Sequence, residues 1–298
     1  MPINFDIRVN RTANFYFFVQ NLASWEPWVR QAANDFWVKK LNIPDGVLGE
    51  AERLAEIHER HSGDPGTYYL GTPFYGEAED PFSDLTAKVG DGEAEKVRRI
   101  FGILAPYFDR LWEEDGPLLE EWKERLSAIM NDRATQDRIC PVLATAYGTD
   151  FESATVRVEL TVSAPDTCGG RANFLDASTV RLEVSRLPAE KVRWPASVLW
   201  HETIHCLYDG ALLKPAIRAV VGEDDPMMIH EVAANSFLPR GYLGQEVLGM
   251  SAPGPRYMSQ LVGRAEEAIA LARFYFDRGE ALGEAYVREV KGLIESQD

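Results

Sequence analysis

Hydrophobic residues recur with the period of an α-helix over most of this 298-residue chain. The segments that show this period are 15–41, 46–61, 92–130 and two helices within 255–298 that separate near Gly279. We expect the 92–130 segment to break near Pro106 and at Gly116–Pro117, because proline lacks the N–H that continues a helix. Residues 62–81 are rich in Gly, Pro and Tyr, which is typical of a loop.

Strict alternation of apolar and polar residues marks a second kind of segment. It occurs at 3–9, 156–162 and 180–184 and predicts three strands, the last two with one buried and one exposed face. The connection at 165–176 begins with turn residues. A short edge strand at Arg171 to Phe174, beside which a substrate backbone could add as a further strand, and an ordinary hairpin connection are both compatible with it.

Together these segments predict an α+β protein that is mostly helical, with a small antiparallel sheet. Residues 1–150 form a mainly helical region that starts with a strand, and residues 151–298 carry the remaining strands and the candidate chemistry described below. With 45% hydrophobic residues, the chain has enough apolar material for one compact unit that combines the two regions.

Charge and composition exclude several classes of partner. The net charge of −16, from 47 acidic against 31 basic residues, argues against nucleic acid and anionic membranes, which need clustered Lys and Arg. The sequence contains neither an apolar stretch of 18 residues nor a basic segment followed by an apolar run near residue 1. Three widely spaced cysteines suit reduced thiols, so we expect a cytoplasmic protein.

Residues 201–205 read His-Glu-Thr-Ile-His. On a helix, His201 and His205 lie about 40° apart around the axis, so both imidazoles can reach one Zn²⁺ while Glu202 leans toward a water on the metal. The rest of this helix is almost wholly apolar, with Leu199, Trp200, Ile204, Cys206, Leu207 and Tyr208. Two core histidines satisfied by backbone groups are the alternative, but a buried stripe of histidines and acids is costly without a metal or a hydrogen-bond network.

A zinc site that keeps a position open for water needs a third protein ligand. Asp225 as N-cap and Pro226 at the first helical position predict a helix from Met227 to Leu238, and Glu231 is its only acid. Glu231 is the favoured third ligand. The adjacent His230 remains a competing one, although the two side chains point about 100° apart on a helix.

The pattern of residues 194–237 resembles the gluzincin metallopeptidases, the group that includes thermolysin and the M1 aminopeptidases. His201, Glu202, His205 and Glu231 match the group's motif, with Glu231 standing 26 positions after His205. Asp209, four residues after the second histidine, matches the thermolysin-like pattern as well. The chain departs from that pattern in two places, with His230 before the glutamate and Asn235 at the position of a supporting acid.

The resemblance implies a two-lobed zinc peptidase with its active site in a cleft. Glu202 would serve as general base and His201, His205 and Glu231 as ligands of Zn²⁺. In such enzymes a Tyr or His often stabilises the oxyanion, and Tyr242 and His230 are the candidates. The expected substrate is a peptide or protein. A catalytically inactive zinc-binding scaffold and a metal hydrolase of a non-peptide substrate remain open, as does the choice between internal and terminal cleavage.

Overall fold

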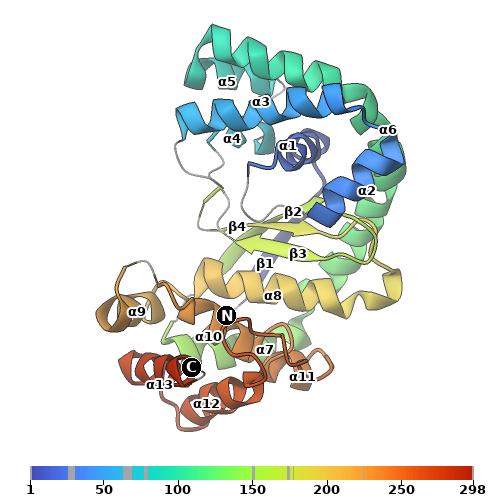
Figure 1. Ribbon diagram of the computed structural model, residues 1–298. Coiled ribbons are helices and arrows are strands. Elements are labelled where there is room, and N and C mark those ends of the chain that lie inside the picture. Colours follow the sequence, from blue (N-terminus) through green and yellow to red (C-terminus); the bar gives the residue numbers. More distant parts are fainter. Residues whose placement is uncertain are drawn as a thin grey trace.

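A small sheet lies between two groups of helices in the computed structural model (Figure 1). Helices α1 to α5 lie on one side of this sheet, the long α6 runs from this group past the edge of the sheet, α8 packs against the other side, and α7 and α9 to α13 lie beyond α8. The structure describes residues 2–25, 31–62, 69–76, 80–149, 152–172, 175–176, 178–223 and 225–296. The protein is mostly helical with a small sheet, as expected for the α+β class.

The first group of helices follows the predicted apolar stripes. Its members are α1 (Arg11–Leu22), α2 (Gln31–Leu41), α3 (Asp45–His61), α4 (Thr72–Tyr75), α5 (Pro81–Val89) and α6 (Asp91–Met130). The expected breaks in α6 are wrong, because this helix runs without interruption through Pro106 and Pro117. Each proline removes one N–H, but buried apolar residues on both sides of each proline hold the helix together. The long helix curves along the edge of the molecule (Figure 1).

The sheet contains β1 (Ile3–Arg8), β2 (Ala154–Thr161), β3 (Gly169–Ala172) and β4 (Thr179–Glu183). Their order is β1-β2-β4-β3, and β1, β2 and β4 run parallel while β3 pairs antiparallel with β4. The sheet is therefore mixed, which corrects the expected antiparallel arrangement. Among the described residues, the seven helices α1 to α7 lie between β1 and β2 in the sequence, and such a long crossover allows parallel pairing, whereas β3 and β4 are joined by a short connection.

The prediction of half-exposed strands is also wrong for most of β2 and β4, since several of their polar residues are buried as well, whereas Thr155 is exposed and Arg157 and Glu183 are half-buried. Glu159 is 1% exposed and Arg181 is 4% exposed. Helix α1 covers this second face, and the Arg181 guanidinium lies 4.5 Å from the ring centre of Phe17. The predicted edge strand is confirmed as β3, two residues earlier than expected. Positions 173 and 174 lie outside the described residues.

The second group of helices forms the remainder of the fold. It contains α7 (Arg133–Tyr147), the 3₁₀ turn η1 (Ala189–Lys191), α8 (Arg193–Leu207), α9 (Leu213–Val221), α10 (Ile229–Phe237), α11 (Tyr242–Glu246), α12 (Ala265–Asp277) and α13 (Glu284–Glu295). The two C-terminal helices separate near Gly279, as predicted. Over the described ranges, the structure contains no helix both long and apolar enough to cross a membrane.

Helix α10 starts later than the sequence indicates. Met228, in a left-handed conformation, precedes its first residue Ile229, and residues 225–228 form a turn instead. Asp225 nevertheless caps the helix, because its carboxylate accepts hydrogen bonds from the N–H groups of Ile229 (2.9 Å) and His230 (3.1 Å). This cap fixes the direction in which the candidate ligand Glu231 leaves the helix.

Candidate metal centre

Helix α8 carries three of the candidate site residues on one buried face. Trp200 and Ile204 are fully buried, and Trp200 packs edge-on against Phe5 of β1 at 5.2 Å. This apolar packing fixes the rotation of the helix about its axis. With this rotation, His201 and His205, which are 7% and 9% exposed, point toward α10.

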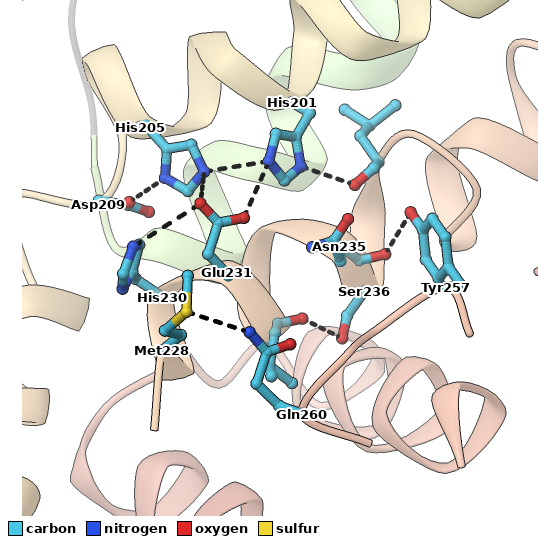
Figure 2. A network of polar contacts seen from close by, with 12 residues as sticks. His201, His205, Asp209, Met228, His230, Glu231, Asn235, Ser236, Tyr257 and Gln260 are labelled. Carbon is cyan, nitrogen blue, oxygen red and sulfur yellow. Dashed lines mark hydrogen bonds and ion pairs between the residues drawn. The ribbon is translucent and has the colours of Figure 1, made fainter. Parts of the chain in front are cut away.

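Three side chains converge between α8 and α10 (Figure 2). The Nε2 atoms of His201 and His205 lie 3.2 Å apart, and the Glu231 carboxylate lies 3.3 Å from the first and 3.5 Å from the second. The potential ligand atoms of this trio all lie within 4.8 Å of one another. Two imidazoles and a carboxylate at this spacing can hold one metal ion.

The other ring nitrogen of each histidine is already engaged. His201 Nδ1 lies 3.0 Å from the Leu238 carbonyl oxygen, which can only accept, so this nitrogen donates. His205 Nδ1 donates to the Asp209 carboxylate at 2.6 Å. Both Nε2 atoms therefore present lone pairs to the space beside Glu231, which is the tautomer that zinc ligands adopt. The donor set and its supporting hydrogen bonds fit Zn²⁺.

Without a bound metal ion, the carboxylates around His205 favour a proton on its imidazole, which a metal ion would replace. Burial alone would lower the pKa of His205, but the Asp209 and Glu231 carboxylates outweigh it and raise that pKa well above its ordinary value. Burial alone would raise the pKa of Glu231, whereas its contacts with His201 and His205 hold that pKa far below the ordinary value. Glu231 is therefore ionised at neutral pH, as a metal ligand must be.

Glu202 lies on the same helix but is held by the sheet. It is 8% exposed, and its carboxylate accepts a hydrogen bond from the backbone of Ala172 in β3. Gly170 of the same strand leaves just enough space, since a Cβ added there would lie 2.4 Å from Glu202 Cγ. Burial raises the pKa of Glu202, although the two histidines act in the opposite direction.

A pocket of about 760 Å³ opens beside these groups. It is lined by Gly170, Arg171, Ala172, Arg181, Glu183, Glu202, His205, Lys214, Ile217, Arg218, Glu223, Asp225, Met228, His230 and Glu231. Its wall therefore combines the edge strand β3, the candidate ligands and one face of α9. A volume of this size accommodates a small ligand or several residues of a peptide.

Comparison with protein-family models, with curated proteins and with solved structures found no match for this chain. The geometry of the site therefore carries the functional argument by itself.

His230 lies next to the ligand cluster. Its Nδ1 is 2.6 Å from the Asp225 carboxylate, and its Nε2 is 3.8 Å from Glu231 Oε1 (Figure 2). Its ring lines the pocket instead of converging with the other three side chains. This placement favours Glu231 as third ligand, as the sequence indicated, and leaves His230 facing a bound ligand.

Two other candidates lie elsewhere. Tyr242 of α11 packs near the Phe276 ring at 6.2 Å and under the Arg273 guanidinium at 4.9 Å, and it is not among the described residues that line the pocket. The backbone oxygen of Asn235 accepts a hydrogen bond from Tyr257 (Figure 2). The partners that orient the two candidate ligand histidines are the Leu238 carbonyl for His201 and the Asp209 carboxylate for His205. Tyr208 is fully buried, as predicted for a packing residue.

Sequence reasoning missed Gly170 and the Leu238 carbonyl. A glycine in an expected strand is a signal of close approach, and it could have pointed to a neighbour of Gly170. No sequence signal marks a backbone carbonyl as the partner of a distant histidine.

Proposed function

We propose that this protein is a zinc-dependent metallopeptidase with a gluzincin-type ligand set. The observation that carries the proposal is the convergence of His201, His205 and Glu231, with Glu202 beside them in the same pocket. Both histidines present Nε2 because Asp209 and Leu238 occupy Nδ1. A chance cluster of buried histidines would not need this shared orientation.

The chain's own groups have separable roles. Bound Zn²⁺ would lower the pKa of a coordinated water to about 7 and polarise a carbonyl group. Glu202 would accept the proton of the attacking water and pass it to the leaving amine. Its burial supports this role, because a raised pKa brings a carboxylate closer to the pH at which it must exchange protons. His230, oriented by Asp225, would donate a hydrogen bond to the developing oxyanion.

A peptide substrate is supported by the position of β3. This strand is at the edge of the sheet, it lines the pocket, and its Ala172 contacts Glu202. An extended peptide could pair with such an edge and reach the general base. The pocket then lies between the sheet on one side and α9 and α10 on the other, in the manner of a two-lobed peptidase.

The test combines metal content with hydrolysis of a peptide library. We expect one zinc ion per chain in the wild-type protein after dialysis, and a large loss in Glu231→Ala. The exposed Glu266→Ala, in the first turn of α12, is the matched control and should keep the metal. Glu202→Gln should keep zinc and lose hydrolysis.

Different outcomes would overturn different parts of the proposal. Absence of zinc from the wild-type protein, even when zinc is offered, would refute the metal centre. Zinc binding without hydrolysis of peptides would indicate a scaffold or a hydrolase of another substrate, which an ester panel with Glu202→Gln as control would separate.

A further inference from the structure

Positive side chains gather at the pocket although the chain as a whole is strongly acidic. Four of the lining residues are cationic, namely Arg171, Arg181, Lys214 and Arg218. The net charge of the chain is −16. The lining also contains five acids, so a preference for a negatively charged ligand depends on which of these charged groups are already paired.

The acids of the same pocket are already engaged. Beyond Glu202 and Glu231, the lining contains Glu183, Glu223 and Asp225. Glu183 lies 3.8 Å from Arg181, Glu223 lies 3.2 Å from Arg218, and Asp225 holds His230 at 2.6 Å. Each of these three carboxylates therefore has a positively charged or hydrogen-bonding neighbour of its own.

Lys214 differs from the other cations. It lies in the first turn of α9 and is half-buried, yet its ammonium group has no hydrogen bond or ion pair within the part of the chain that the structure describes. Its neighbour one turn on, Ile217, is 3% exposed and fixes the orientation of this helical face. Lys214 therefore offers the pocket an ammonium group that can bind a ligand without first losing an internal partner.

Lys214 is also tied to the metal centre through the backbone. Its N–H donates to the carbonyl oxygen of Asp209 at 3.0 Å, and the Asp209 carboxylate orients His205. The same short segment therefore positions a candidate metal ligand and the ammonium group. Fixed spacing between them would let Lys214 set the position of a substrate group relative to the reacting bond.

The edge strand contributes a second positive feature. Arg171 of β3 and Arg181 of β4 are direct partners in the antiparallel register, and both line the pocket. The buried Arg181 guanidinium is held by the Phe17 ring at 4.5 Å and lies 3.8 Å from Glu183, so Arg171, on the edge strand, is the guanidinium better placed to assist a ligand. Planar guanidinium groups also match the geometry of a carboxylate.

We propose that the pocket selects peptides with a carboxylate near the scissile bond, and that Lys214 is its main contact, assisted by Arg171. The inference rests on the proposed peptidase function and names its substrate class. The carboxylate can come from an acidic side chain or from the free C-terminus of the peptide. The two sources are distinguished by the experiment below.

The experiment measures binding without cleavage. Four fluorescent peptides of sequence Ala-Ala-Leu-Xaa-Ala, with Xaa as Glu or Gln and with a free or amidated C-terminus, are titrated into the zinc-loaded Glu202→Gln protein. Fluorescence anisotropy gives each Kd. We expect one carboxylate-bearing class to bind roughly tenfold more tightly than the neutral peptide, because the contact is charge-assisted and partly shielded from water.

Variants then identify the contact. Adding Lys214→Met should reduce the tenfold preference to about one, and Lys214→Arg should retain it. The matched control is Lys191→Met, which removes a lysine that pairs with Asp166 on the surface. It should leave the preference unchanged. Preference should also weaken as the salt concentration rises.

The outcomes separate the inference from the function on which it rests. Preference for Glu at Xaa identifies an acidic side chain as the recognised group, and preference for the free C-terminus identifies the terminal carboxylate. Equal binding of all four peptides, binding of none, or a preference that survives Lys214→Met overturns the inference. If the wild-type protein cleaves acidic and neutral peptides equally, the peptidase function is supported and the carboxylate preference is overturned. If Lys214-dependent binding occurs and the wild-type protein cleaves no peptide, carboxylate recognition is supported and the peptidase function is refuted.

Discussion

Gly170→Ala tests whether the edge strand positions Glu202, the proposed general base. An added Cβ would lie 2.4 Å from Cγ, 2.6 Å from Oε1 and 2.8 Å from Cδ of Glu202. Ordinary contacts begin at 3.4 Å, so the Glu202 side chain must move by about 1 Å or the strand must shift by a similar amount. The substitution adds one methyl group and changes no charge.

The size of the effect follows from this displacement. A misplacement of about 1 Å in a reacting group costs roughly 100-fold in rate, or ~2.7 kcal/mol of transition-state stabilisation. Glu202 is not among the three converging ligands, so zinc content should not change. Thermal stability should fall modestly, because a buried side chain must move to admit the added methyl group.

The assay compares kcat/KM on a peptide substrate with zinc content and melting temperature for the same preparations. Gly102→Ala in α6 is the matched control, because a Cβ at that exposed helical position meets nothing within 4 Å. It should keep full activity and, as a helical Gly→Ala change, add up to about 1 kcal/mol of stability.

A double-mutant cycle decides whether the loss passes through Glu202. In the Glu202→Gln background, Gly170→Ala should cost little further activity, because both changes remove the same contribution. Full activity of Gly170→Ala with bound zinc would refute the assigned position of the general base. A full additional 100-fold loss in the double variant would show that β3 acts on another group.

Three further predictions concern the ligands and the buried acid of β2. Asp209→Asn should weaken zinc affinity about 10- to 100-fold, measured by competition with a chelator, because the hydrogen bond from His205 Nδ1 loses its charged acceptor. His230→Ala should keep zinc, measured by mass spectrometry, but lower kcat; loss of the metal would make His230 a ligand. Burial raises the pKa of Glu159 to about 7. Its folded pKa exceeds the unfolded value, so the protein gains stability as pH falls through 7 toward 4.5. Glu159→Gln should therefore raise the free energy of unfolding at pH 8 by up to about 3 kcal/mol, seen as a higher melting temperature, and should not raise it at pH 5; an equal shift at both pH values would contradict this.

The ligand cluster could be anticipated because most of its determinants are local in sequence. His201, His205 and Asp209 repeat every four residues, so one helical period brings the imidazoles together and places the carboxylate behind the second. Glu231 could be predicted because it is the only acid of the helix whose start Asp225 and Pro226 indicate. The start of that helix was predicted too early, since residues 225–228 form a turn in which Asp225 still caps from outside.

The sheet shows where such reasoning stops. Alternation reveals strands and their faces, but it does not give the direction in which neighbours pair, and the parallel pairing of β1 with β2 depends on the long helical crossover formed by α1 to α7. Alternation also indicated that Glu159 and Arg181 would face water. Their burial arises because α1, more than 130 residues earlier, covers that face of the sheet.

The same distinction explains why specificity was harder to foresee than chemistry. The candidate metal ligands come from two helices whose own periodicity orients them, whereas the pocket wall combines β3, β4 and α9, which meet only after the sheet and the second helical group have packed. Lys214 lies beside the site because its helix follows the segment that orients His205, and Gly170 lies beside it because its strand passes close to Glu202. Substitutions at these two positions therefore test the tertiary arrangement itself, while substitutions at His201 or His205 test only the motif.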